Sequence, residues 1–290
     1  MISSPTFIGG AFRSGTTLLR AMLAQHSAIA SGLETYWFEC DPRGRNTPAF
    51  KDRMDKLASF FEIDRALLDD FAARTSSPAA LLDLFMAEVA RRQGKPRWAE
   101  KTPGNVAHIK EILAYWPRAY ILHIVRDPKD VFASLERGGK SGGPSGFADI
   151  WCNVVANGRR DAAALGIVGS QYLELRYETL VTAPEATMRQ VLDFIALPWE
   201  PEVARFAGKQ DEFDKVLAVT GKASTTLDAL RQPLNQDKLG AWARLVTPQQ
   251  IEAVRQEVAA RGFGAMFAED EAASERIWRD AAAEGAAGQR

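Results

Sequence analysis

A phosphate-binding loop near the start of the chain is the clearest chemical feature of the sequence. Residues 10–17 read Gly-Ala-Phe-Arg-Ser-Gly-Thr-Thr, which has the spacing of the P-loop pattern G-x-x-x-x-G-K-[ST] with threonine in place of the lysine. A glycine-flanked turn at a helix N-terminus directs backbone N–H groups inward, where they bind an anion without needing a cation. The candidate ligands combine one planar guanidinium with the hydroxyls and backbone of the turn: Arg13, Ser14, Gly15, Thr16 and Thr17.

The missing lysine limits the chemistry of this loop. In P-loop ATPases that lysine reaches the β- and γ-phosphates, so Thr16 argues against γ-phosphoryl transfer and favours binding of a terminal anion. The alternative is an ordinary turn between a strand and a helix, with its serine and threonines in water. Because an apolar strand precedes the loop and a helical pattern follows it, phosphate binding is the favoured interpretation.

Arg126 is the centre of a second candidate anion site. It directly follows an apolar run at 118–125, and ligands in open α/β sheets bind at the carboxyl ends of the strands. Ser134 lies about two turns along the helix expected next, and is placed to reach the same anion. Two alternatives stay open: Asp127 as the magnesium-binding aspartate of a Walker B strand, or a surface ion pair between Arg126 and Asp127.

The elements that must position these residues alternate between strands and helices. Apolar runs predict strands at 6–11, 118–125 and 171–177, and helical spacing appears after the loop from Thr17 and at 128–137. This alternation predicts an α/β, P-loop-like, three-layer fold with a central parallel sheet and helices on both faces. Threonine capping boxes are expected at Thr182 and Thr247, each ahead of a helix.

Three segments stand outside this alternation. Residues 41–95 are charged and amphipathic and predict a helical insertion over the sheet, with Ser77 capping a helix that starts at Pro78. The glycine-rich segment 138–146 predicts a mobile loop and a candidate active-site flap. Residues 268–290 are rich in alanine and glutamate and predict an exposed or frayed tail, which leaves a single domain at 1–267.

The composition excludes several classes of protein. A net charge of -1 provides no basic field to attract nucleic acid or an acidic membrane surface. Two cysteines, Cys40 and Cys152, and three histidines without ligand spacing predict neither a disulfide framework nor a metal site. No stretch approaches the roughly 20 apolar residues of a membrane span, so a cytoplasmic location is the default expectation.

Together, these motifs resemble those of the sulfotransferases that use 3'-phosphoadenosine 5'-phosphosulfate (PAPS) and release 3',5'-bisphosphoadenosine. The closest pattern is that of the tyrosylprotein sulfotransferases, in which R-S-G-T-T-L-x-R-A-M-L-x-x-H is followed by G-x-E-T. Here residues 13–26 match the first run, and Gly32-Leu-Glu-Thr35 matches the second. The likeness extends to Arg126-Asp127 with Ser134, to Arg176-Tyr177-Glu178, and to Pro233-Leu-Asn235 with Trp242.

The resemblance implies how the donor is held. By this likeness residues 13–17 hold the 5'-phosphosulfate, while Arg126 and Ser134 hold the 3'-phosphate. Tyr177 lies near the adenine, and Lys238 is a weaker candidate ligand of the 3'-phosphate.

The resemblance also implies the catalytic residues. Glu34 matches the glutamate that deprotonates the acceptor hydroxyl, and Lys101, together with Arg13, matches the groups that stabilise the sulfuryl and bridging oxygens. Many cytosolic sulfotransferases read K-T-H from this lysine, with histidine as the base. This chain has Pro103 there, which favours Glu34, with His108 as the reserve base and His123 expected in the core. Tyr36 stands where the tyrosylprotein enzymes carry an arginine, so recognition of acidic peptides draws no support from this position.

The expected function is therefore sulfuryl transfer from PAPS to a hydroxyl-bearing acceptor, which the sequence leaves open between a small molecule, a sugar and a peptide tyrosine. The oligomeric state is also open. Two other functions compete with it. A P-loop kinase for a nucleotide or small molecule is opposed by Thr16, and a degenerate nucleotide-binding domain is opposed by the joint presence of Arg13, Lys101 and Glu34.

Overall fold

A parallel sheet forms the centre of the protein in the computed structural model. The structure describes residues 4–39, 47–75, 77–221 and 231–287, so Cys40, residues 41–46 of the insertion and 288–290 of the tail lie outside it. Its strands are β1 (Thr6–Gly9), β2 (Ile29–Ala30), β3 (Arg97–Lys101), β4 (Tyr120–Val125) and β5 (Tyr172–Arg176). They pair in the order β2-β3-β1-β4-β5, and each described pair is parallel. The predicted α/β class is confirmed.

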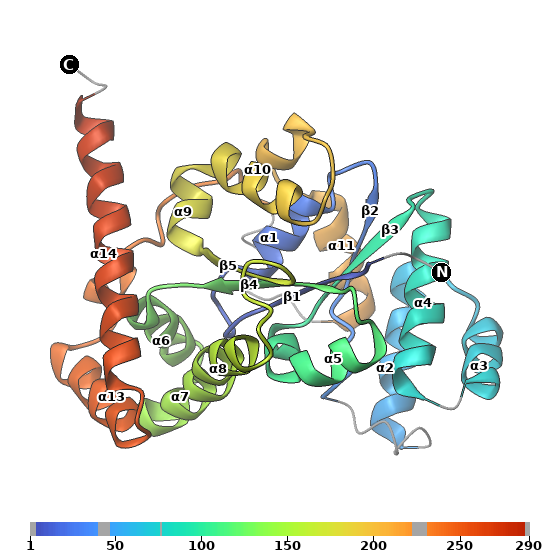
Figure 1. The fold of residues 1–290 in the computed structure, drawn as a ribbon, viewed down its shortest axis with the longest axis horizontal. Helices are drawn as coiled ribbons and strands as arrows, with labels where there is room; N and C mark the ends of the chain where they lie inside the picture. Colours follow the sequence, from blue (N-terminus) through green and yellow to red (C-terminus); the bar gives the residue numbers. More distant parts are fainter. Residues whose placement is uncertain (1–3, 40–46, 76, 222–230, 288–290) are drawn as a thin grey trace.

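Helices cover both faces of this sheet (Figure 1). On one face pack α1 (Thr16–Leu23), α9 (Tyr177–Thr182) and α10 (Pro184–Phe194), against strand residues such as Ile8 and Leu122. On the other lie α5 (Ile109–Tyr115), α6 (Pro128–Arg137), α7 (Gly143–Trp151) and α8 (Asn157–Ala164). Because side chains alternate along a strand, neighbours such as Ile121 and Leu122 enter different cores. The apolar run of β4 is therefore the pattern expected of a strand that is buried on both faces.

The predicted insertion contains α2 (Pro48–Phe61), α3 (Arg65–Arg74) and α4 (Pro78–Arg92), which stand at the β2 end of the sheet (Figure 1). Their apolar side chains share one core with Phe7 and Trp98 of the sheet. Ser77 accepts a hydrogen bond from the backbone N–H of Ala80 and caps α4 at Pro78, as predicted. The division into a domain at 1–267 and a tail at 268–290 stays a prediction.

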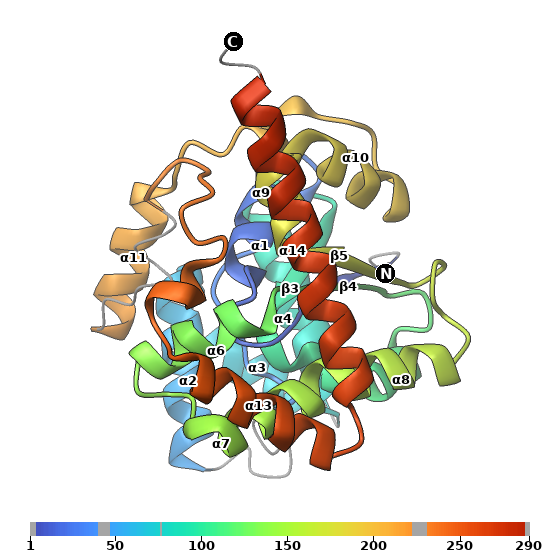
Figure 2. The same cartoon turned by 90° about the vertical axis from the view of Figure 1, so that its left-hand side faces the viewer.

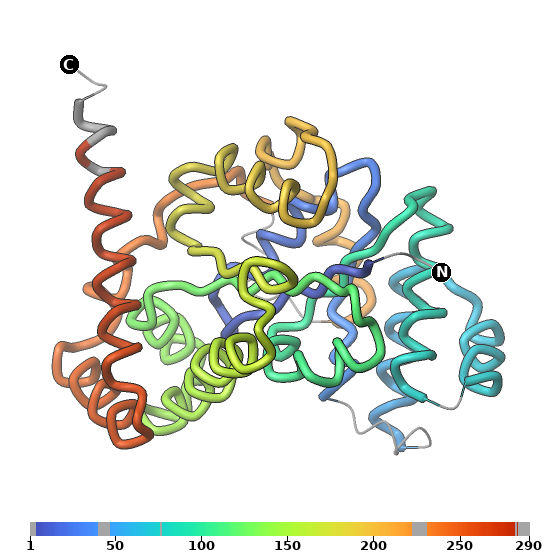
Figure 3. Tube along the Cα trace, viewed as in Figure 1, coloured from blue at the N-terminus to red at the C-terminus, as the bar shows by residue number. Residues whose placement is uncertain are grey.

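The remaining helices follow β5 and α10 in the chain. Among the described residues they are α11 (Gln210–Thr220), α13 (Pro248–Ala260) and α14 (Gly264–Ala287). Elsewhere in the chain, short 3₁₀ turns lie at Pro103–His108, Pro201–Ala204 and Ala241–Arg244, and a π-helical stretch lies at Cys152–Ala156. Figure 2 shows α14 running from α13 up past α9, and Figure 3 traces the chain as it reaches this outer position after completing the sheet. The last described helix therefore packs on elements formed much earlier in the sequence.

Several sequence predictions need correction. Both β2 and β3 were missed, because β2 has only two residues and β3 reads Arg-Trp-Ala-Glu-Lys, without an apolar run. The capping box expected at Thr182 is wrong, because its hydroxyl donates to the carbonyl of Glu178, whereas the one at Thr247 is confirmed. The flap expected at 138–146 is shorter, because α7 already begins at Gly143 and Ser141 is buried against Glu136.

The expected exposure of the tail is wrong for the first turns of α14. Asp270, Glu271 and Ser274 are buried although this stretch has few apolar residues. Asp270 accepts hydrogen bonds from the guanidinium groups of Arg159 and Arg176, at 2.8 and 3.0 Å for Arg159. Ion pairs thus hold this helix against the rest of the protein. The sequence of the helix lacks an apolar stripe, so it did not indicate that these residues would be buried.

This docking predicts that Asp270→Ala destabilises the protein. The change leaves two arginines without their buried partner, and breaking such a pair costs about 3 kcal/mol of the free energy of unfolding. Urea unfolding measures this loss, with Asp280→Ala, an exposed position on the same helix, as the control. Equal stability of both variants would show that the ion pairs do not hold α14.

Candidate active site

The loop between β1 and α1 has the left-handed turn that its sequence predicts. Gly15 precedes α1 with φ 98°, a conformation that residues with a Cβ rarely adopt. A Cβ at this position would lie 2.5 Å from Cδ2 of Tyr177. Glycine is therefore required here, and the loop packs directly on the Tyr177 ring.

Arg126 and Ser134 come from the β4–α6 junction. β4 ends at Val125, and the side chain of Asp127 caps α6 by accepting a hydrogen bond from the N–H of Lys129 at 2.9 Å. Arg126 donates to the carbonyl of Arg13 at 3.2 Å, and Nε of Arg13 donates to Oγ of Ser134 at 2.9 Å. The structure therefore joins the two anion sites of the sequence analysis into one continuous site.

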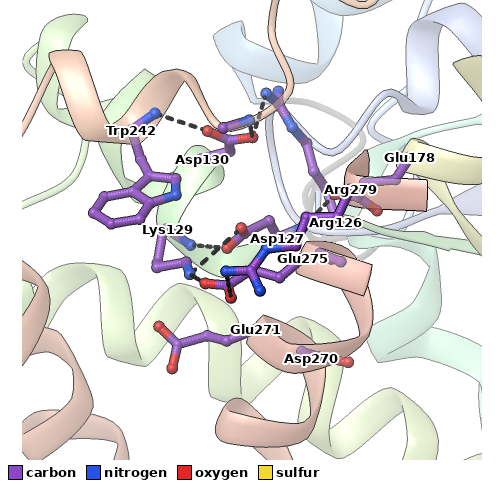
Figure 4. A network of polar contacts seen from close by, with 12 residues as sticks. Arg126, Asp127, Lys129, Asp130, Glu178, Trp242, Asp270, Glu271, Glu275 and Arg279 are labelled. Carbon is purple, nitrogen blue, oxygen red and sulfur yellow. Dashed lines mark hydrogen bonds and ion pairs between the residues drawn. The ribbon is translucent and has the colours of Figure 1, made fainter. Parts of the chain in front are cut away.

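A buried carboxylate, Asp130, fixes Arg126 from behind (Figure 4). It lies 3.3 Å from Arg126 and accepts hydrogen bonds from the backbone N–H groups of Gly240 and Trp242 at 3.0 and 2.9 Å. Arg126 in turn donates to the carbonyl of Lys238 at 2.5 Å, and its guanidinium stacks 4.6 Å from the centroid of the Tyr177 ring. Asp130 thus connects Arg126 to the chain at residues 238–242, so that these parts form one continuous wall of the site.

A cleft of about 260 Å³ opens between these elements. Its lining includes Arg13, Gly15, Thr16, Thr17, Arg126, Asp130, Ser134, Arg137, Tyr177, Asp237, Lys238 and Arg244. Basic side chains thus outnumber acidic ones among the described lining residues. Burial and the charges of Arg126 and Arg137 lower the pKa of Arg13, and burial together with the charges of Arg126, Arg13 and Arg137 lowers that of Lys238. Such mutual repulsion is relieved by a bound polyanion.

Two further observations concern the fit of a phosphate-bearing ligand. The Nε of Arg126 is buried and has no hydrogen-bond partner within the described residues, so it keeps a donor for a ligand. Ser14 is also buried, but it does not belong to the described lining of the cleft, unlike its neighbours Gly15 and Thr16. The site accordingly offers guanidinium groups, threonine hydroxyls and loop backbone to an anion.

Lys101 and Glu34 lie directly behind the loop. Nζ of Lys101, at the end of β3, donates to Oγ1 of Thr17 at 3.0 Å and is also ion-paired with Oε1 of Glu34. Burial opposes the ionisation of Glu34, but the charge and hydrogen bond of Lys101 bring its pKa below the usual range. Burial lowers the pKa of Lys101 despite this carboxylate. A carboxylate and an ammonium group thus adjoin the cleft through Thr17.

The segment after β2 is held by the end of β3. Glu100 is buried and its carboxylate accepts hydrogen bonds from the N–H and hydroxyl of Thr35, at 3.2 and 2.9 Å, and from the hydroxyl of Thr102 at 2.8 Å. The Thr102 hydroxyl accepts from the N–H of Tyr36 at 3.0 Å. Each of residues 100–102 therefore holds one residue of the segment 34–36.

The other titratable candidates lie elsewhere. His108 stacks on Phe38 and lies 3.8 Å from Glu111, with no described contact to Glu34 or Lys101. His123 is in the core, as predicted, and burial lowers its pKa to about 4. Asp127 is buried behind β4, where burial raises its pKa to about 8. Its side chain caps α6 and is not among the described residues that line the cleft, which weighs against the Walker B interpretation.

Arg137 and Arg244 are lining residues that the sequence reasoning missed. Arg137 lies about one turn beyond Ser134 on α6, so the helical period was the signal that could have found it. Arg244 is in a 3₁₀ turn after Trp242, and nothing in its local sequence marks it.

Comparison with known proteins defines the class. Residues 5–201 match the sequence profile of the Sulfotransferase family. The chain belongs to this family.

The family includes relatives of known name and structure. Protein-tyrosine sulfotransferase 1 of Danio rerio is 26% identical over 245 residues, which cover 81% of this chain and 64% of that relative. The chain thus spans less than two thirds of that protein's length. The sulfotransferase domain of the Synechococcus PCC 7002 olefin synthase has the same fold, with a TM-score of 0.62, 19% identity and coverage of 88% of this chain and 95% of that domain. Mouse sulfotransferase SULT7A1, solved in complex with PAP, gives a TM-score of 0.51 at 13% identity, over 92% and 89% of the two chains.

Across the described residues, no helix combines the length and apolar character that crossing a bilayer requires.

The environment of Asp127 predicts a pH dependence that Asp127→Asn removes. With a pKa of about 8 when folded and near 4 when unfolded, Asp127 binds its proton more tightly in the folded state. Its contribution to stability is therefore present below about pH 4 and declines as the pH rises toward 8. Asparagine keeps the helix cap, so the free energy of unfolding of the variant should improve relative to the native protein between pH 5 and pH 8.

Urea unfolding at the two pH values measures this difference. Asp149→Asn, at an exposed aspartate paired with Arg261, is the matched control. Parallel profiles for Asp127→Asn and the native protein would mean that Asp127 is ionised in the folded state.

Proposed function

We propose that the protein is a PAPS-dependent sulfotransferase that transfers a sulfuryl group to a hydroxyl acceptor, with Glu34 as general base. The observation that carries this proposal is the continuity of two features. A cleft rich in basic side chains is lined by Arg13 and by residues 15–17 of the loop, and the Lys101–Glu34 pair contacts that loop through Thr17. PAP, the abbreviation for 3',5'-bisphosphoadenosine, is the ligand named for the SULT7A1 structure, which supports PAPS as the donor.

The cleft suits a doubly phosphorylated adenosine. The loop N–H groups, Arg13 and the threonine hydroxyls would hold the 5'-phosphosulfate, while Arg126, Ser134 and Lys238 would hold the 3'-phosphate. The ring of Tyr177 would contact the adenine of the nucleotide. Arg137, which no sequence motif marked, adds a further positive charge to the cleft. The repulsion among these cations supports a ligand with several negative charges.

The residues behind the loop suit the transfer step. Glu34 accepts the acceptor's proton as the acceptor oxygen bonds to sulfur, and the bond from sulfur to the phosphate oxygen breaks, which leaves the bisphosphate and a sulfate ester. Lys101 donates to the sulfuryl and bridging oxygens, where negative charge accumulates. Alignment of the acceptor against the donor supplies the rest of the rate enhancement.

The chemical class of the acceptor and the cellular location of the protein are also proposals. A tyrosine in a peptide is supported by the names of the relatives, and a small phenol or a sugar hydroxyl needs the same base. A cytoplasmic location stays a prediction. A screen of tyrosine peptides, phenols, sugars and lipid alcohols with labelled PAPS, read by mass spectrometry, identifies the acceptor class.

Arg126→Ala should weaken binding of 3',5'-bisphosphoadenosine by about 10- to 100-fold, the usual effect of losing a hydrogen bond to a charged group. Binding of 5'-AMP should change much less, because that nucleotide has no 3'-phosphate. Isothermal titration calorimetry measures both. Arg118→Ala, an exposed arginine just before β4, is the control. An equal loss of affinity for the two nucleotides would contradict the assignment of Arg126 to the 3'-phosphate. If the native protein bound neither nucleotide, PAPS would be ruled out as the donor.

Glu34→Gln should keep the affinity for 3',5'-bisphosphoadenosine and lose turnover by about 10²- to 10⁴-fold, the usual contribution of a general base. Glutamine retains the size of the side chain and an acceptor oxygen, while it removes the carboxylate that accepts the proton and pairs with Lys101. Glu111→Gln, an exposed substitution of the same kind, should behave as the native protein. Full turnover by Glu34→Gln would assign the base elsewhere, whereas turnover dependent on ATP and magnesium would favour a kinase.

A further inference from the structure

We propose that Tyr36 is a positioning residue for Glu34: its phenol holds one carboxylate oxygen, so that the base stays aligned while Lys101 serves the sulfuryl group. The inference rests on the proposed function of Glu34 and deepens it. Its starting point is that the two oxygens of Glu34 have separate partners.

Oε1 of Glu34 accepts from Lys101, and Oε2 accepts from the hydroxyl of Tyr36. Lys101 also donates to Thr17 at the cleft, 3.0 Å away, so its ammonium group is shared between the loop and the carboxylate. Within the described residues, the Tyr36 hydroxyl donates to Glu34 alone. When Lys101 turns toward a sulfuryl oxygen, the tyrosine remains as the partner that orients Glu34.

The backbone of Tyr36 is held in a conformation that its side chain does not favour. Its φ of 50° lies in the left-handed region, which is uncommon for a bulky residue. The hydrogen bond from its N–H to Oγ1 of Thr102, which itself donates to Glu100, secures this turn from β3. Strained backbone of this kind persists where surrounding contacts determine it, and it is concentrated at functional sites.

The ring of Tyr36 is fixed from a different element. The guanidinium of Arg53, on α2, lies 4.6 Å from the ring centroid, a cation–π geometry. The phenol is therefore held at its backbone by β3 and at its ring by the helical insertion. This double attachment aims the hydroxyl at Glu34 rather than leaving it in solvent.

The charges around this contact agree with a donating phenol. Burial and the charge of Glu34 raise the pKa of Tyr36, so the hydroxyl keeps its proton. The hydrogen bond from Tyr36 is one of the contributions that lower the pKa of Glu34, after the larger effect of Lys101. The charged groups that face Glu34 are Lys101 from β3, Arg20 from α1, Arg53 from α2 and Glu39 from its own segment.

The test is Tyr36→Phe, which removes only the hydroxyl. Carbon-detected NMR of protein with labelled glutamate carboxyl groups follows the titration of Glu34, whose signal is assigned by its absence in Glu34→Gln. The midpoint should move to higher pH in Tyr36→Phe, because a hydrogen bond to the ionised form is lost. Turnover of PAPS with 4-nitrophenol as the phenolic probe should fall by about 10- to 100-fold, the usual effect of losing a hydrogen bond to a charged group.

Tyr115→Phe, the same change at an exposed tyrosine on α5, should leave the Glu34 titration and turnover as in the native protein. Thermal unfolding and the affinity for 3',5'-bisphosphoadenosine should be unchanged in Tyr36→Phe, which separates positioning from a general structural role. An unmoved Glu34 titration overturns the inference, as does faster turnover, since that would make the phenol a competitor of the acceptor. Full activity of Glu34→Gln would instead refute the proposed base, and the NMR titration would still decide whether Tyr36 holds Glu34.

Discussion

Carboxylates placed behind basic side chains keep this site in shape. Arg126 pairs with Asp130, Lys101 with Glu34, and Arg20 with Glu212, so these three cations each have an acidic partner. Without these partners, several positive charges at close range would push one another apart, because their interaction is weakly screened where water is excluded. The arrangement leaves an excess of positive charge among the described residues that line the cleft, while these three cations are locally neutralised.

Side-chain contacts also link the segment that carries Glu34 to the sheet. The end of β3 carries Glu100, Lys101 and Thr102 in succession, and each holds a different residue of the segment 34–36. Parallel pairing of β3 with β1 brings this strand end beside the phosphate-binding loop. The geometry of Glu34 is therefore set by strand register, which is more rigid than a loop, and α2 contributes through Arg53, whose guanidinium lies over the Tyr36 ring.

The sequence predicted best where local pattern and burial agree. The loop at 10–17, the apolar β4 and the helix that starts at Pro128 follow directly from glycine spacing, apolar runs and proline at a helix start. β3 could not be found this way, because a strand that reads Arg-Trp-Ala-Glu-Lys is placed in the sheet by pairing with β1 and β2, which are far away in the chain. The burial of Asp270 and the lining by Arg244 have the same origin. Glu34 and Lys101 were identified from their likeness to family motifs. Their contact could not be predicted, because it depends on β3, which the sequence did not reveal.

The position of α14 has a consequence for how the chain matures during synthesis. Lys129, three residues beyond Arg126, is buried and ion-paired with Glu275 at 2.6 Å, and its ammonium group lies 4.6 Å from the centroid of the Trp242 ring (Figure 4). Every strand is translated before Glu275, so the sheet can assemble on the ribosome while the α6 wall of the cleft still lacks these partners. The α6 wall of the cleft is thus among the last of the described parts of the molecule to gain its final contacts.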